Sequence, residues 1–361
     1  MDYYVDTRQR DFDQLRISGS KGHADFFDVL NNMGLNCIRI PTLRHSDRIT
    51  ITERITLEMQ LRKAWRHSLK DIGAGDRLIL HSPPSEKFIG LTAVMREVKE
   101  RGCKICAVVF DTEQFYMPQY KRAAMLKHIL DRKLENSLFS IADVVVAHTE
   151  VMKNMLTNRG IDKTKIICAG AWDHLMDEGF DIENTHCRIR QDMPIVFCGN
   201  LEKNKSGFLY SQNINARIDL YGPGYTGSES DTVAYKGVFR SEELVDRIEG
   251  SYGLVWDGPS CESCTGTYGE YLLYNIPHKV SFYLASGLPI IIWDKAAMAD
   301  LILSEGCGLT VRNLSEIKQK TDSVDLYEYQ KMREAAMRVG DAMRTGNYIK
   351  SFMEKALDMM R

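Results

Sequence analysis

Short apolar runs separated by amphipathic stretches recur along the whole chain. Runs such as residues 105–110 and 144–147 are uninterrupted apolar segments, which is typical of strands buried on both faces of a parallel sheet. Most stretches between the runs have the length and periodicity of a helix with one buried face. Strand and helix therefore alternate, and the pattern predicts an α/β fold of the doubly wound type.

The alternation stops once and then begins again. Residues 172–192 are polar, carry mixed charge and show little periodicity, so we interpret them as a linker. The pattern predicts an N-terminal domain over residues 1–171 and a C-terminal domain over 193–344, and a chain of 361 residues fits two domains. A helix over 345–361 is expected to pack back on the N-terminal domain.

The elements can be placed along the chain. Strands are expected at residues 3–5, 37–40, 78–80, 105–110, 144–147 and 165–168, and then at 195–198, 217–220, 233–235, 253–256, 290–293 and 308–311. Helices are expected at 23–33, 52–69, 86–101, 119–138, 242–248, 278–286 and 296–304, after Thr149 as an N-cap, and from Tyr327 onward with weak breaks at Gly340 and Gly346.

Composition excludes some classes of protein. Lys and Arg number 47 against 49 Asp and Glu, so the net charge gives no indication of a nucleic-acid binder. No apolar run reaches the roughly 18–20 residues of a membrane span, and no signal peptide is evident, so we expect a cytoplasmic protein. Peripheral contact with the inner face of a membrane stays open.

Nine scattered cysteines favour a reducing compartment over a disulfide framework. Cys103 and Cys106 fall in an apolar strand, where residues three apart point to opposite faces. Cys261 and Cys264 lie in a loop without a second pair nearby. We expect structural thiols and no metal site.

Four loops of the second half follow strands: 199–201, 221–224, 237–239 and 257–258. Their glycines allow a ligand to approach the backbone, although a plain turn explains any one of them. None matches the dinucleotide or P-loop fingerprint, which weakens a dehydrogenase or ATPase hypothesis. Lys279, in the first turn of a predicted helix, adds a cation to the positive helix end and suits a diphosphate.

Here the chain resembles a known family. The runs GNL at 199–201, LYG at 220–222, GLVWDG at 253–258 and GTYGEYLLYNIPHKVSFYLASGLPIIIW at 266–293 resemble bacterial β-1,6-galactofuranosyltransferases and the glucosyltransferase that extends GlcNAc on streptococcal serine-rich adhesins. The likeness covers roughly 195–315. The likeness is weaker in the first half of the chain, where the main similar features are Gly19-Ser20-Lys21 and the strand before Asp111.

The resemblance implies a GT-B fold of two Rossmann-like domains facing a cleft, with a UDP-sugar in the C-terminal domain, the acceptor in the N-terminal one and no metal or other cofactor. It also implies site residues. Those expected to face the donor are Asn200, Asn275, His278 and Lys279, with Val238 and Phe239 at the uracil and Tyr221 and Gly222 beside the nucleoside. Asp257 is expected either to bind a sugar hydroxyl or to fix its loop, and Lys21 and His23 are expected on the acceptor side.

The β-linkages of the resembled enzymes imply inversion, which requires a base for the acceptor hydroxyl. The candidates are Asp111, which we favour, and His23, His81 and Glu86. Glu262 and Glu270 have the spacing of a pair found in retaining enzymes, which we interpret as chance. The basic residues of the helix over 119–138, namely Lys121, Arg122, Lys127, Arg132 and Lys133, are expected to form a solvated face, with a lipid-binding role as the alternative.

We therefore expect a hexosyltransferase that moves galactofuranose or glucose from a UDP-sugar to a hydroxyl of a lipid- or protein-linked glycan, in surface polysaccharide or glycoprotein synthesis. A UDP-sugar epimerase of the same fold and a non-catalytic partner of another transferase remain alternatives. Whether the chain forms a homo-oligomer stays open.

Overall fold

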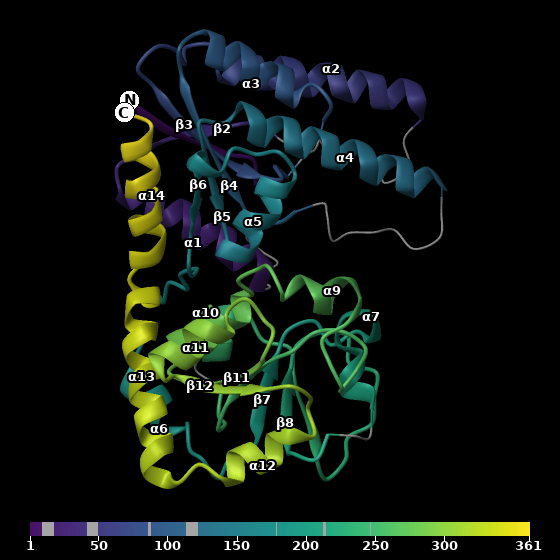
Figure 1. Cartoon of the computed structure of the whole chain (residues 1–361), viewed down its shortest axis with the longest axis vertical. Helices are drawn as coiled ribbons and strands as arrows, with labels where there is room; N and C mark the ends of the chain where they lie inside the picture. Colours follow the sequence, from purple (N-terminus) through teal and green to yellow (C-terminus); the bar gives the residue numbers. More distant parts are fainter. Residues whose placement is uncertain are drawn as a thin grey trace. The chain divides into compact units, whose positions relative to one another are not determined.

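The computed structural model describes residues 1–8, 18–41, 50–85, 88–112, 122–177, 179–211, 214–245 and 247–361 (Figure 1). The chain divides into two compact units. The first contains Met1–Leu15, Phe26–Ala169 and Lys350–Arg361, and the second contains Arg16–Asp25 and Gly170–Ile349. Two helices contribute residues to both units: α1 (Ser18–Asn32) and α14 (Asn347–Met359).

The first unit is built on a six-stranded parallel sheet in the order β2-β1-β3-β4-β5-β6. Its strands are β1 (Asp2–Asp6), β2 (Asn36–Arg39), β3 (Arg77–Ser82), β4 (Lys104–Val109), β5 (Val144–Ala147) and β6 (Ile166–Cys168). The central strands are buried along almost their whole length, because helices cover both faces of a doubly wound sheet.

The helices of the first unit lie between these strands in sequence. They are α2 (Ile51–Ser68), α3 (Leu91–Glu100), α4 (Arg122–Ile141) and α5 (Glu150–Asn158), with a 3-10 turn at Lys163–Lys165. Helix α3 packs against both α2 and α4, and Figure 1 shows the three side by side. Thr149 is the N-cap of α5 and accepts a hydrogen bond from the Met152 N–H, as expected.

The second unit repeats the architecture with the strand order β12-β11-β10-β7-β8-β9. Its strands are β7 (Ile195–Cys198), β8 (Ile218–Tyr221), β9 (Val233–Gly237), β10 (Gly253–Val255), β11 (Ile290–Trp293) and β12 (Gly308–Val311). Its helical segments are α6 (Ile182–Cys187), α7 (Lys203–Ser206), a 3-10 turn at Gly207–Tyr210, α8 (Ser241–Val245), α9 (Gly266–Tyr271), α10 (His278–Ala285), α11 (Ala299–Glu305), α12 (Glu316–Asp322) and α13 (Leu326–Arg344).

The doubly wound α/β fold predicted from the sequence is confirmed, and each of the twelve expected strands is present in the described part of the chain. The stretch 172–192, interpreted as a linker, contains α6 and begins with buried Trp172, Asp173 and His174. Among the described residues, no helix combines the length and the apolar character that crossing a membrane requires.

Several helix predictions are wrong. Helix α1 begins at Ser18 instead of residue 23, and α11 begins at Ala299 instead of residue 296. Helix α13 continues through Gly340, where a break was expected, and the chain breaks only near Gly346. Helix α3 begins at Leu91 instead of residue 86, because the Glu58 carboxylate on α2 accepts hydrogen bonds from the N–H groups of Ile89 and Gly90. Periodicity within a segment cannot reveal such a contact from another helix.

Candidate functional site

The order of the second sheet identifies a place for a ligand. After β7 the chain adds β8 and β9 on one side, and then returns to place β10 on the other side of β7. Ligands of doubly wound sheets bind at the carboxyl ends of the strands, where the order reverses in this way. Here that point is lined by Gly199 and Asn200, which follow β7, and by Trp256 and Asp257, which follow β10.

Lys279 reaches into this point from the first turn of α10. Its Nζ lies 2.6 Å from Oδ1 of Asp257 and 3.2 Å from the Trp256 carbonyl oxygen. It also lies 4.3 Å from the centroid of the Phe197 ring on β7. The Lys279 side chain is only 12% exposed. Burial lowers the pKa of this ammonium group, the neighbouring Asp257 carboxylate opposes that change, and Lys205 adds to it.

The buried residues of α10 fix the position of the helix and so of Lys279. Tyr283, one turn further along, is fully buried, accepts a hydrogen bond of 2.7 Å from the Cys198 N–H and donates one of 3.4 Å to the Leu254 carbonyl. The hydroxyl therefore joins β7 to β10 where the strand order reverses. Sequence reasoning did not select Tyr283, although it belongs to the PHKVSFYLA segment that carries the family resemblance.

At two of the predicted loops the backbone lies so close to a neighbouring group that a side chain would not fit. Gly222 has φ +141°, and a Cβ there would lie 1.8 Å from the carbonyl oxygen of Gly199. Gly199 has φ +148°, and its Cβ would lie 3.1 Å from Cε of Lys279. The loops after β7 and β8 are thus in contact beside Lys279, and only glycine fits both positions.

Asn275 and His278 precede Lys279 in the chain. The His278 ring lies against Gly22, where a Cβ would come within 1.9 Å of Cε1. Burial, with a smaller contribution from Lys205, lowers the pKa of His278 to about 4, so its imidazole is neutral at pH 7. Oδ1 of Asn275 is buried without a hydrogen-bond partner in the described structure. An acceptor of this kind is available to a ligand donor.

The residues expected at the nucleoside lie at the end of β8, where Tyr221 is the last residue, and after β9. Tyr221 is buried and its ring centroid is 6.2 Å from that of Phe239. The Arg247 guanidinium makes a cation–π contact with Phe239, with its Cζ 5.0 Å from the ring centroid. Val238 is exposed. Asn200 is exposed as well, and its Oδ1 accepts a hydrogen bond from the Glu202 N–H.

Lys21 and His23, expected on the acceptor side, belong by their contacts to the second unit. Nζ of Lys21 lies 2.5 Å from Oδ1 of Asp25 and 2.7 Å from the Leu175 carbonyl oxygen, and Oδ2 of Asp25 accepts from the Leu175 N–H. His23 is half-buried. The structure thus places the segment of Gly22 against His278 within one unit.

In the first unit, the corresponding reversal of strand order lies between β1 and β3. Nε2 of His81 lies 3.0 Å from Oγ1 of Thr7 there, and the His81 ring is 1% exposed. Burial lowers the pKa of His81 to about 4. Asp111 follows the next strand, β4; it is half-buried and its Oδ1 accepts the Thr112 N–H at 2.8 Å. Asp111 is therefore more accessible to a substrate than His81.

Several expected residues lie outside the described part. These are Glu86 and Lys121, together with the side chains of Arg122 and Lys127. Arg132 and Lys133 are exposed on α4, and Glu262 and Glu270 are exposed in the second unit. Cys103, Cys106, Cys261 and Cys264 are buried free thiols. No group of three or more His, Cys, Asp or Glu among the described residues is arranged to hold a metal ion.

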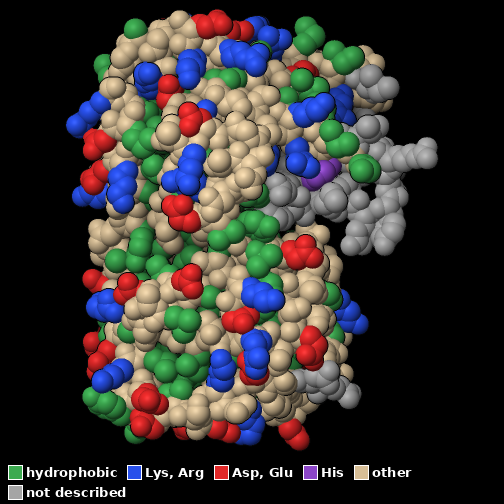
Figure 2. Space-filling model, viewed as in Figure 1, with side chains coloured by type: hydrophobic (Ala, Val, Ile, Leu, Met, Phe, Trp, Pro, Cys, Tyr) green, Lys and Arg blue, Asp and Glu red, His purple; other side chains and the backbone are tan. Residues whose placement is uncertain are grey.

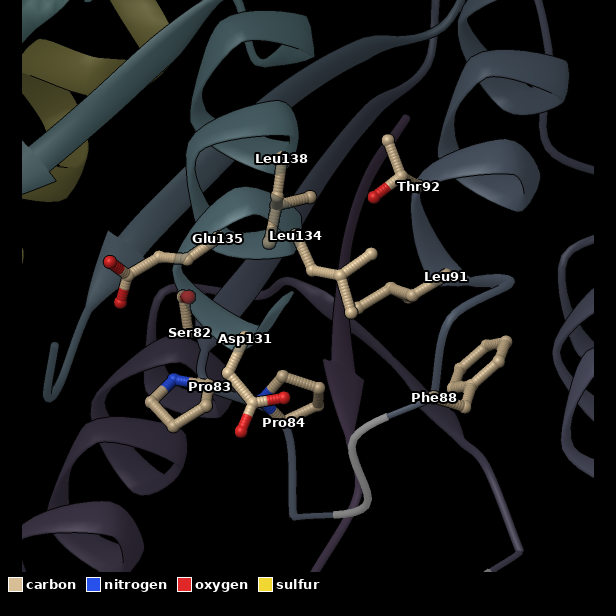
Figure 3. A pocket seen from close by; sticks show the side chains of 10 residues that line it. All are labelled: Ser82, Pro83, Pro84, Phe88, Leu91, Thr92, Asp131, Leu134, Glu135 and Leu138. Carbon is tan, nitrogen blue, oxygen red and sulfur yellow. The ribbon is translucent and has the colours of Figure 1, made fainter. Parts of the chain in front are cut away.

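A mainly apolar pocket is lined in part by Ser82, whose carbonyl oxygen accepts the Asp111 N–H at 3.3 Å (Figure 3). It is lined by Ser82, Pro83, Pro84, Phe88, Leu91, Thr92, Asp131, Leu134, Glu135 and Leu138. Figure 3 shows Leu91 and Leu134 facing each other across it. Glu135 is already engaged, since its Oε2 accepts from the Thr112 hydroxyl at 3.0 Å and from Arg159 at 2.8 Å. The pocket therefore suits the apolar part of a ligand.

Comparison with known proteins decides the family. The chain matches the glucosyltransferase 3-like N-terminal domain over residues 12–171 and the glucosyltransferase 3-like C-terminal domain over residues 195–356. It belongs to the glucosyltransferase 3-like family. The two domain matches together cover most of both units, and the resemblance noted in the sequence is confirmed.

Two relatives are enzymes with named activities. The β-1,6-galactofuranosyltransferase WbbI of Escherichia coli K12 is 32% identical over 221 residues, which cover 61% of this chain and 64% of that protein. Glucosyltransferase 3 of Streptococcus gordonii is 25% identical over 294 residues, which cover 80% of this chain and 81% of that protein. The match to the first relative thus spans less than two thirds of its length.

Solved structures of low sequence identity share the fold. Sucrose-phosphate synthase of Thermosynechococcus elongatus matches with a TM-score of 0.60 at 11% identity, over 99% of this chain and 98% of that one. Anabaena HepE, solved in complex with UDP, matches with a TM-score of 0.57 at 10% identity, over 99% of both chains. The GT-B fold predicted from the sequence is therefore confirmed.

Proposed function

We propose that this protein is a hexosyltransferase that moves galactofuranose or glucose from a UDP-sugar to a hydroxyl of a glycan acceptor, with inversion at the anomeric carbon. The names of the two relatives support the reaction class and the two sugars. The UDP complex of HepE supports the nucleotide, since HepE shares the fold. A role in surface polysaccharide or glycoprotein synthesis is part of the proposal.

One observation carries the assignment of the donor site. A largely buried lysine, Lys279, lies where the strand order of the second sheet reverses, at the N-terminal end of α10 and against Gly199, which in turn contacts Gly222. An ammonium group and a helix N-terminus together offer positive charge to a diphosphate. Asn275, with its unpartnered Oδ1, and neutral His278 lie beside it in sequence.

In the proposed reaction, the acceptor oxygen attacks the anomeric carbon while the bond from that carbon to the β-phosphate oxygen breaks. The hydroxyl proton passes to the Asp111 carboxylate, and UDP leaves with its added charge stabilised by Lys279 and the end of α10. Such stabilisation accelerates the reaction because the charge develops in the transition state. We propose that these groups make a metal ion unnecessary, and that the acceptor binds the first unit, where the apolar pocket adjoins Thr112.

Replacing Lys279 tests the donor site. UDP binding, measured by isothermal titration calorimetry, is expected to weaken at least about tenfold in Lys279→Ala, or about 1.4 kcal/mol. Because that change leaves Asp257 without its partner, the double variant Lys279→Ala/Asp257→Asn removes both charges and is expected to bind UDP equally weakly. Lys320→Ala is the matched control, since Lys320 lies on α12, away from the donor site, and donates to the Thr310 carbonyl oxygen. Wild-type affinity in the folded double variant would refute the assignment.

The alternatives differ in their products. Incubation with UDP-galactofuranose or UDP-glucose and a glycan acceptor is expected to yield UDP and an extended glycan. An epimerase converts the UDP-sugar without any acceptor, and a non-catalytic partner neither transfers nor hydrolyses it. Chromatography of the nucleotide sugars separates the three outcomes.

A further inference from the structure

Exposed apolar side chains gather on one part of the first unit. Helix α2 exposes Ile55 and Met59, the loop before α3 exposes Ile89, and α4 exposes Met125, Ile129 and Leu130, each between 38% and 67%. We call these six residues, with the exposed basic residues named below, the α2–α4 surface. The other large apolar side chains exposed in the described structure are scattered over both units.

Contacts show that the three segments adjoin. The Glu58 carboxylate accepts the Ile89 and Gly90 N–H groups at 3.0 and 2.6 Å, which holds the loop against α2 next to Met59. Phe88 of the same loop and Leu134 of α4 line one pocket, and Leu130 lies one helical turn before Leu134. The exposed apolar residues of both helices are therefore connected through the loop before α3.

Positive charge predominates among the exposed side chains of this surface, where Glu53 is the acidic one on the described parts of α2 and α4. Arg54, Lys63, Arg132 and Lys133 are exposed and make no ion pair in the described structure. Glu53 completes a capping box with Thr50, and Glu58 holds the loop through the Ile89 and Gly90 N–H groups. Glu58 and Asp131, the latter next to Arg132, are only half-exposed. Figure 2 shows basic and hydrophobic side chains, with fewer acidic ones, on the part of the molecule over α2 and α4.

We infer that the α2–α4 surface docks on an anionic lipid bilayer. Apolar side chains flanked by Lys and Arg insert at the boundary of head groups and acyl chains, while the cations attract anionic head groups. A second copy of this chain fits less well, because a two-fold contact brings two surfaces with the same excess of positive charge together. The inference concerns where the protein works and does not depend on the proposed transfer reaction.

Vesicle flotation with the full chain tests the inference. We expect binding to vesicles of phosphatidylcholine with phosphatidylglycerol, weak binding to phosphatidylcholine alone, and release by added salt, which screens surface charges. Two variants divide the contributions: Ile55→Ser/Met59→Ser/Ile129→Ser and Arg54→Gln/Lys63→Gln/Arg132→Gln/Lys133→Gln. The first is expected to lower partitioning at least about tenfold, and the second to abolish the preference for anionic lipid.

Leu303→Ser/Leu326→Ser is the matched control, because these side chains are similarly exposed but lie in the second unit. It is expected to bind vesicles like the wild-type protein, and thermal unfolding checks that every variant is folded. The inference is overturned if the wild-type protein does not prefer anionic vesicles, or if the serine variant on α2 and α4 binds like the wild type. It is also overturned if that variant instead converts a wild-type dimer into a monomer, which would identify a second copy as the occupant.

Discussion

The pair of Lys279 and Asp257 shows what a single residue can and cannot reveal. A lysine in the first turn of a helix is electrostatically unfavourable, and the sequence alone suggests an anionic ligand as the compensation. The structure supplies another compensation within the protein, since Oδ1 of Asp257 lies 2.6 Å from Nζ. A diphosphate must therefore compete with a carboxylate already in place, and the double variant described above separates the two effects.

His81 predicts a dependence of stability on pH. Its pKa is lowered from 6.5 to about 4 by burial, so the unfolded chain binds more protons than the folded one between these values. The stability that neutral His81 contributes is present above pH 6.5 and is lost as the pH falls toward 4. The free energy of unfolding should fall over this range by about 2–3 kcal/mol more in the wild type than in His81→Asn. Urea denaturation at several pH values measures the free energy of unfolding of both proteins. The prediction is contradicted if the two free energies fall in parallel with pH.

At the scale of elements, the strands were predicted more accurately than the helix ends. A buried strand such as β11, IIIW, is specified by its own apolar run and by the turns beside it. Helix boundaries depend on neighbours, as with Glu58 at the start of α3. Short helices such as α7 and α9 lack enough residues to show a period, and the sequence did not predict them.

Gly340 offers a test of how far contacts with a neighbouring helix override local helix propensity. Helix propensity alone predicts that Gly340→Ala stabilises α13 by about 1 kcal/mol. A Cβ at this position would lie 1.9 Å from the Leu284 carbonyl oxygen on α10, which packs against α13. We therefore expect Gly340→Ala to destabilise the protein by about 2 kcal/mol or more, because backbone must move. Denaturant unfolding measures the change, and Glu334→Ala, at an exposed position of α13, should shift stability by less than about 0.5 kcal/mol.

For the whole molecule, the proposed chemistry predicts a response to ligand and to chelator. UDP at about a hundred times its dissociation constant is expected to stabilise the folded protein by about 2.7 kcal/mol and to raise its melting temperature. Because Lys279 and the end of α10 are proposed to meet the diphosphate charge, EDTA should leave this increase unchanged. Differential scanning fluorimetry measures it. An increase that EDTA removes and Mg²⁺ restores would show that a metal ion takes part.

Much of the candidate donor site was predictable because its residues lie near one another in sequence or directly after strands. Asn275, His278 and Lys279 share one short segment, and the loops at Gly199, Gly222 and Asp257 follow buried strands whose carboxyl ends meet at one edge of a parallel sheet. The packing of Gly22 against His278 was not predictable, because the two residues are far apart in the chain and neither segment's pattern depends on the other.

The sequence by itself determined the fold class, the number and place of the strands, and the family, because apolar periodicity and a long motif are local properties of the chain. Only the tertiary structure decided that Asp257 is the partner of Lys279, that Tyr283 joins β7 to β10, that α13 continues through Gly340, and that α2 and α4 expose neighbouring apolar residues. Each of these depends on which segments meet in space. Contacts between distant segments are set by packing and by the pairing of buried polar groups, which no local pattern contains.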